Sequence, residues 1–200
     1  GPTFCSGFDL ALCQADPTGG TMRRLLVGLS RVIRAMQGLS VPVVVGVQGA
    51  AIAGGCALLS GADLVVTHMD AKLGYPVVRL GISPAVNAPV FRRAVGDRAA
   101  RARLLDPALF DGLEARRIGL ATLCVDTTED VIPRAQIEAM KLAAKPPGAF
   151  ATTKLWLNEI EGSDRDGEMD RALGVSLSLV GGDEERALLA KMWAKESGGT

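Results

Sequence analysis

A run of apolar residues at positions 41–47, VPVVVGV, stands out from the mixed polar and apolar pattern around it. β-Branched residues in a nearly unbroken run suit a strand that is covered on both faces, as in a parallel sheet flanked by helices. Small residues follow and include the pair Gly54-Gly55, after which 56–60 are compatible with a helix. We therefore expect a buried strand, a glycine-lined turn and a helix start between positions 41 and 63.

Paired glycines at the start of a helix leave backbone N–H groups unobstructed. These donors, together with the positive end of the helix dipole, can stabilise a negative charge that develops beside them. The plainer explanation is that Gly54 and Gly55 only let the helix pack closely on the strand, and short glycine motifs often mean no more than this. The turn by itself leaves both interpretations open.

The remaining pattern predicts further helices and strands in alternation. Apolar positions at steps of three and four predict helices over 22–36, over 88–95 with a continuation to 105, and over 131–144. Short apolar runs predict strands at 64–67 and 120–125, an extended piece at 71–76 and a helical turn or loop at 77–81. Asp111, followed by Glu114, predicts a capping box for a helix over 112–118. Strand, glycine turn, helix and strand in this order form a parallel α/β unit.

Pro146-Pro147 marks the clearest internal boundary. It divides the chain into an α/β core, 1–145, and a helical region, 146–200, with helices predicted over 148–160, 165–180 and 183–196. Apolar residues alternate along part of the middle segment, a spacing that is also typical of a strand. The opening GPTFCSGFDL is a turn that ordinarily follows a strand, so we expect the first part of the fold to be missing from the sequence.

Composition excludes several classes of function. With 22 acidic and 22 basic residues, the chain has no basic field for nucleic acid and no polybasic membrane patch, and its apolar runs are too short to span a bilayer. We expect a cytoplasmic protein with neither a nucleic-acid nor a membrane partner. Four widely spaced cysteines are expected to be reduced and mostly buried. The single histidine, His68, makes a His-based metal site or a Ser-His-Asp triad difficult to assemble, so we expect no metal.

Seven segments together are more specific than any single motif. They are FCSGFDL at 4–10, VPVVVGVQGAAIAGGC at 41–56, SGADLVV at 60–66, AKLGYPVVRLGISP at 71–84, RRAVG at 92–96, EARRIGLA at 114–121 and AAKPPGAFATTK at 143–154. In this order they resemble the crotonase superfamily, the enoyl-CoA hydratase/isomerase family, over essentially the whole chain. The resemblance implies an α/β fold of stacked ββα units with a C-terminal α-helical trimerisation region. It also implies a homotrimer or dimer of trimers acting on acyl-CoA, with coenzyme A as part of the substrate and no separate cofactor.

The chemistry shared by that family is stabilisation of a thioester enolate by two backbone N–H groups. By position these correspond to the amides of Phe8 and Gly54, while Asp9 is expected to hold the loop that presents Phe8. Hydratases of the family carry two glutamates, at positions that hold Ala57 and Val77 here. Neither side chain can move a proton, and a positioned acid or base accelerates such a step roughly 100- to 10,000-fold.

The other polar residues near these segments are weaker candidates for proton transfer: Tyr75, Ser83, Asn87 and Asp106. Each is more readily explained as a turn former or a surface group. Three functions therefore stay open: a CoA-thioester enzyme of lyase or isomerase type with an unusual acid or base, a non-catalytic acyl-CoA-binding or assembly protein, and a conventional enoyl-CoA hydratase.

Overall fold

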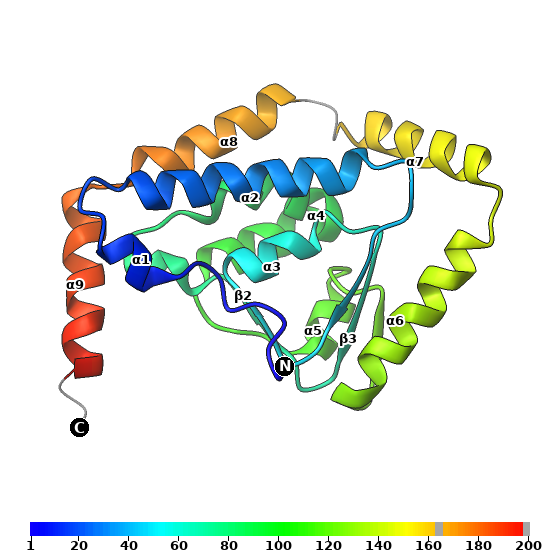
Figure 1. Cartoon of the computed structure of the whole chain (residues 1–200), viewed down its shortest axis with the longest axis horizontal. Helices are drawn as coiled ribbons and strands as arrows, with labels where there is room; N and C mark the ends of the chain where they lie inside the picture. Colours follow the sequence, from blue (N-terminus) through cyan, green and yellow to red (C-terminus); the bar gives the residue numbers. More distant parts are fainter. Residues whose placement is uncertain (163–165, 198–200) are drawn as a thin grey trace.

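Two small parallel sheets form the centre of the computed structural model, which describes residues 1–162 and 166–197 (Figure 1). One sheet has the order β1-β3-β5, formed by Val44–Val47, Leu64–His68 and Leu123–Val125. The other pairs β2, Ala50–Ile52, with β4, Lys72–Gly74. The parallel pairing agrees with the predicted α/β unit. Residues 50–52 were expected to belong to the turn, and they form a strand because their backbone pairs with β4.

The valine-rich strands are covered on both faces, as predicted. Val47 and Val65 join the main core, whereas Val66 packs with Val131 on the opposite face. That face is covered by α6, Thr128–Ala143, which lies along the three-stranded sheet (Figure 1). Gly46, the interruption in the run, allows the close approach of α6, because a Cβ there would lie 3.1 Å from Ile132 Cδ1.

Helices occupy most of the predicted positions. They are α1 (Leu10–Gln14), α2 (Gly20–Gly38), α3 (Gly54–Leu59), α4 (Ala88–Leu105), α5 (Gly112–Arg117), α7 (Pro147–Glu161), α8 (Asp166–Ser178) and α9 (Asp183–Ser197), with 3-10 helices η1 (Pro76–Leu80) and η2 (Pro84–Asn87). Helix α4 bends at Gly96, whose φ is 79°. The middle C-terminal segment is a helix, so its alternating apolar residues did not indicate a strand. The expected break at Ser163-Asp164 and the first residue of the 165–180 segment lie outside the described residues.

The C-terminal helices are held against the rest of the chain by buried polar contacts. Helix α8 lies beside α2 and η2 (Figure 1), and the buried Ser176 hydroxyl donates to the Ser83 carbonyl at 2.9 Å and accepts from the Val86 amide at 2.8 Å. On α7, the buried Lys154 ammonium lies 2.7 Å from the Asp63 carboxylate and also donates to two backbone carbonyls. Burial requires these partners, since an unpaired buried charge is costly.

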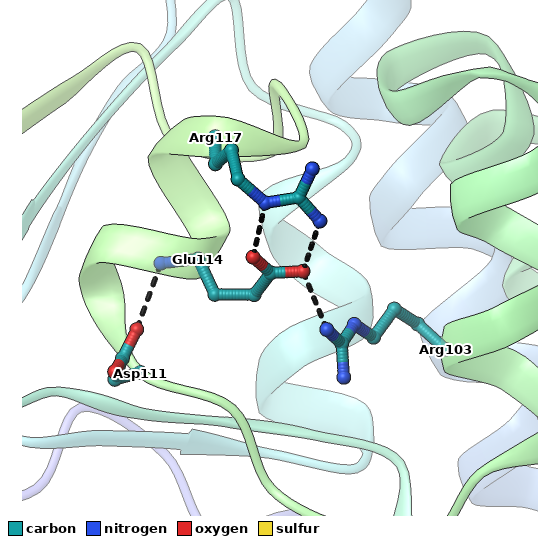
Figure 2. A network of polar contacts seen from close by, with 4 residues as sticks. All are labelled: Arg103, Asp111, Glu114 and Arg117. Atoms are coloured by element: carbon teal, nitrogen blue, oxygen red, sulfur yellow. Dashed lines mark hydrogen bonds and ion pairs between the residues drawn. The ribbon is translucent and has the colours of Figure 1, made fainter.

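The start of α5 is held by the network in Figure 2. The Asp111 carboxylate accepts from the Glu114 amide at 2.7 Å, which confirms Asp111 as an N-cap. The Glu114 carboxylate does not close the predicted capping box. It accepts instead from Arg117, at 2.5 and 2.7 Å, and from Arg103 (Figure 2). Hydrogen bonding to Arg117, together with Arg103, lowers the pKa of Glu114 from its ordinary 4.5 to about 2.

This network predicts a measurable acid dependence of stability. Because the folded-state pKa of Glu114 is lowered to about 2, its carboxylate contributes stability above the unfolded pKa that is lost as the pH falls from 4.5 toward 2. We expect the free energy of unfolding of Glu114→Gln to fall less steeply than that of the wild type over this range in urea denaturation. The exposed Glu159, replaced by Gln, is the control and should follow the wild type. Parallel curves for wild type and Glu114→Gln would contradict the assignment.

Candidate active site

A tight approach between two backbone segments builds the centre of the site. The loop before α1 joins β2 as a parallel bridge, in which the Cys5 amide donates to the Ala50 carbonyl at 3.1 Å and the Ile52 amide donates to the Cys5 carbonyl at 2.9 Å. A Cβ on Gly55 would lie 2.2 Å from the Cys5 carbonyl oxygen. Only glycine fits there, so the second member of the glycine pair is required for the loop to reach α3.

The turn that begins α3 is strained. Ala53 has φ 55° and ψ −117°, and it is the one non-glycine residue with positive φ among the described residues. Such a conformation costs about 1–3 kcal/mol and persists only where neighbouring contacts enforce it. The Ala53 amide donates to the Gly74 carbonyl at 2.8 Å, and the Ala53 carbonyl accepts from the Ala57 amide at 3.0 Å. These contacts fix the direction of the following amide, that of Gly54.

Phe8 and Gly54 meet at this junction. A Cβ on Gly54 would lie 3.3 Å from Phe8 Cε1, so the Phe8 ring covers Gly54. Neither the Phe8 N–H nor the Gly54 N–H donates to an acceptor within the described part of the chain. Asp9 holds the loop as expected, because its carboxylate caps α1 by accepting from the Ala11 and Leu12 amides at 3.0 and 3.1 Å. Two backbone donors without an acceptor in the described part of the chain therefore belong to residues that are in contact, one in the loop before α1 and one at the start of α3.

A cavity of about 540 Å³ opens beside Phe8 and Gly54. Its walls come from the loop before α1, from α2, the 53–57 turn, η1, η2 and α9. Ala57 and Val77, which the resemblance sets at the hydratase glutamate positions, line this cavity, and no aspartate or glutamate does so among the described residues. The walls are mostly apolar, so the site offers backbone donors for negative charge but no carboxylate to move a proton.

Tyr75 and Asn87 meet in the cavity wall. Both are buried, 1% and 0% exposed, so neither is a surface group. The Asn87 Nδ2 donates to the Tyr75 hydroxyl at 2.7 Å, whereas Asn87 Oδ1 has no partner within the described residues. Burial raises the pKa of Tyr75 well above its ordinary value and that of the neighbouring Cys56 to about 12. Both groups therefore stay protonated at neutral pH and cannot act as bases.

The two other candidates are placed differently. Ser83 lines the cavity, but its hydroxyl accepts from the Ala85 amide at 3.2 Å and caps η2. Asp106 does not line the cavity. It is exposed beyond the end of α4, where its carboxylate accepts from the Ala108 amide at 2.9 Å. Sequence reasoning missed Arg79 and Lys191, which both line the cavity; the spacing of Leu188, Lys191 and Met192 at i, i+3 and i+4 could have indicated a shared helix face.

Other chemistry-bearing groups lie apart from one another. Cys13 and Cys56 are buried, Cys5 and Cys124 are half-buried, and all four are free thiols. Over residues 1–162 and 166–197, histidine, cysteine and carboxylate side chains form no group of three that could hold a metal ion. Within the same residues, no helix combines the length and the apolar character needed to cross a bilayer.

Known proteins share both the sequence pattern and the fold. The family model for "Enoyl-CoA hydratase/isomerase" matches residues 1–168. A Thermus thermophilus protein provisionally named enoyl-CoA hydratase is 30% identical over 99% of this chain and 73% of its own length, and a crotonyl-CoA hydratase of Syntrophomonas wolfei is 29% identical over 90% and 67%. The crystal structure of an enoyl-CoA hydratase/isomerase from Mycobacterium paratuberculosis, 22% identical, superposes with a TM-score of 0.84 over 96% of this chain and 76% of that one. The superposition confirms the predicted crotonase-like α/β fold.

The contact between Tyr75 and Asn87 predicts a loss of stability on removing one hydroxyl. Tyr75→Phe keeps the edge-to-face ring contact with Phe91, whose centroid lies 5.3 Å away, but deprives the buried Asn87 amide of its closest partner. We expect the free energy of unfolding to fall by about 1–3 kcal/mol in urea denaturation. In a double-mutant cycle with Asn87→Ala, the combined loss should be smaller than the sum of the single losses. Strict additivity would show that the hydrogen bond contributes nothing.

Proposed function

Because the chain belongs to the enoyl-CoA hydratase/isomerase family, we propose that it binds acyl-CoA thioesters and stabilises a thioester enolate with the amides of Phe8 and Gly54. In an enolate, the thioester carbonyl oxygen gains the negative charge left when a bond to the α-carbon is broken. Two fixed N–H donors aimed at that oxygen stabilise the charge without rearranging at the moment of reaction. The observation that supports this role is the pairing of two free amides beside a cavity.

The reaction we propose is not standard hydration. Hydration of an enoyl thioester needs a group that activates water and a group that protonates the α-carbon. Ala57 and Val77 line the cavity and can do neither, and the buried Tyr75 and Cys56 stay protonated because burial raises the pKa of each. The α-carbon must then exchange its proton with a group on the substrate or with water.

A second candidate function is favoured by the same two positions. If no group supplies or removes the proton, the protein binds acyl-CoA without turnover, as a carrier or an assembly subunit that retains the fold. Conventional enoyl-CoA hydration, the activity in the names of its relatives, is the third candidate. A panel of acyl-CoA and enoyl-CoA thioesters, with product detected by mass spectrometry and binding by calorimetry, separates the three.

We also propose that copies of the chain associate through α6 and α7, as homotrimers or dimers of trimers. These helices expose large apolar side chains, among them Met140 at 66% and Ile160 at 60%. Exposed apolar side chains in this number on two consecutive helices favour an interface. Sedimentation of the purified chain tests the proposal, and a monomer at micromolar concentration would reject it.

Proline at position 54 tests the proposed donor directly. Gly54 is the first residue of α3, so proline there removes an N–H that has no intrahelical partner. We expect Gly54→Pro to turn over the best thioester of the panel roughly 100- to 1,000-fold more slowly than Gly54→Ala, which keeps the N–H. Circular dichroism establishes that both variants are folded. Equal rates for two folded variants would remove Gly54 from the chemistry.

Restoring the two glutamates tests the missing acid and base. We expect the double variant Ala57→Glu, Val77→Glu to hydrate crotonyl-CoA roughly 100- to 10,000-fold faster than the wild type. The matched variant Ala57→Gln, Val77→Gln has similar volume without a titratable group and should show no gain. A wild-type enzyme that already hydrates crotonyl-CoA at about 1–1,000 per second would refute our objection to standard hydration.

A further inference from the structure

Two cations line the same cavity from different elements. Arg79 comes from η1 and Lys191 from α9, and both are exposed at one end while contributing to the wall. Neither makes a hydrogen bond or an ion pair with any residue that the structure describes. Because no carboxylate lines the cavity within the described residues, the charged side chains in this wall are all positive.

The packing of α9 on η1 brings together the two elements that carry these cations. A Cβ on Gly81, which ends η1, would lie 3.0 Å from both the backbone nitrogen and the Cα of Glu185. Arg79 precedes Gly81 by two residues, and Lys191 follows Glu185 by six, about 9 Å along the helix. Leu188, Lys191 and Met192 share one helix face, and all three line the cavity. Lys191 therefore belongs to the side of α9 that faces the site.

We infer that the acyl group of the substrate carries a carboxylate at its far end, which Arg79 and Lys191 bind, so that the preferred ligands are CoA thioesters of dicarboxylic acids. The inference rests on the proposed function, since it assumes that the thioester carbonyl lies at Phe8 and Gly54. Two like charges beside an apolar cavity repel each other, and an anion placed between them relieves this repulsion. Charge-assisted hydrogen bonds to a carboxylate are also stronger than neutral ones.

The phosphates of coenzyme A are the other source of negative charge. The pantetheine arm separates them from the thioester. Arg79 and Lys191 line the same cavity of about 540 Å³ as Phe8 and Gly54, so the inference assigns both cations to the acyl end of the ligand. The plain alternative is that both side chains only lay their aliphatic stems on apolar surface and keep their charges in water.

A matched pair of ligands tests the inference: glutaryl-CoA and valeryl-CoA have the same number of acyl carbons and differ in the terminal carboxylate. By calorimetry, we expect the wild type to bind glutaryl-CoA about 10- to 100-fold more tightly than valeryl-CoA, the range for a charge-assisted hydrogen bond. The double variant Arg79→Gln, Lys191→Gln should lose this preference and bind valeryl-CoA as the wild type does. Arg186→Gln removes an α9 cation that does not line the cavity and should leave the preference intact.

Each other outcome rejects a different statement. If the double variant weakens both thioesters and free CoA equally, the cations bind the phosphates and the inference is wrong. If the wild type binds the two thioesters equally, Arg79 and Lys191 contribute only their aliphatic stems to the cavity wall, and the inference is again wrong. The proposed function is not affected by that result. If the wild type binds neither thioester nor free CoA, the proposed function itself fails.

Discussion

The contact between the Cys5 carbonyl and the backbone of Gly55 is the constraint on which the site depends. No side chain separates the two segments, because a Cβ at Gly55 would overlap the Cys5 oxygen at 2.2 Å. The loop before α1 can therefore bridge β2, and Phe8 reaches the first residue of α3. A larger residue at position 55 would push this loop away from α3, and the contact between Phe8 and Gly54 would be lost. The strain at Ala53 has the same origin, since the chain must turn sharply to leave β2 and present Gly54.

The C-terminal helices complete the walls of the cavity beside this contact. Helix α8 fixes η2 through the buried Ser176, which bonds backbone groups on either side of Pro84, and α9 closes the cavity against η1 at Gly81. The α/β core supplies the donors, and the helical region supplies one wall and one of the two cations. The boundary at Pro146-Pro147 thus separates two regions of sequence that build one site. Loss of the packing of α9 would open the cavity to water and weaken every electrostatic interaction inside it.

Helices and strands could be predicted from the sequence wherever they depend on a pattern of residues close together in the chain. The valine run, the steps of three and four along α2 and the Asp111 cap each depend on residues close in the chain, and each was predicted correctly. Residues 50–52 were missed as a strand because three residues are too few to carry a periodic signal, and pairing with the distant Lys72–Gly74 segment makes them one. The helix predicted over 165–180 is present as α8, and its apolar residues alternate because Val175 and Leu179 are apolar although they are exposed, 54% and 44%.

Some residues of the cavity could be singled out from the sequence and others could not, again because only local patterns are visible in it. Phe8, Gly54, Ala57 and Val77 belong to segments whose order is specific to the family, and the structure places all four at one cavity. Asp106 was a candidate only because it lies near a turn, and it stays at that turn. Tyr75 and Asn87 are twelve residues apart and join through the cavity wall, while Arg79 and Lys191 are brought to the site by the packing of α9 on η1. No spacing in the sequence encodes contacts of this kind, because they depend on how whole elements dock.

The distribution of charge in the cavity limits the chemistry that it can support. Backbone amides stabilise an anion without a titratable group, so their effect does not depend on a matched pKa, and the apolar walls strengthen it by excluding water. A carboxylate at position 57 or 77 would place a negative charge in the cavity that Phe8 and Gly54 also line. Ala57 and Val77 carry no charge, and the charged residues that line the cavity within the described part of the chain, Arg79 and Lys191, have the sign that favours an anion. This lining, apolar apart from a few polar groups and two cations, agrees with the proposed binding of an acyl group that carries a carboxylate.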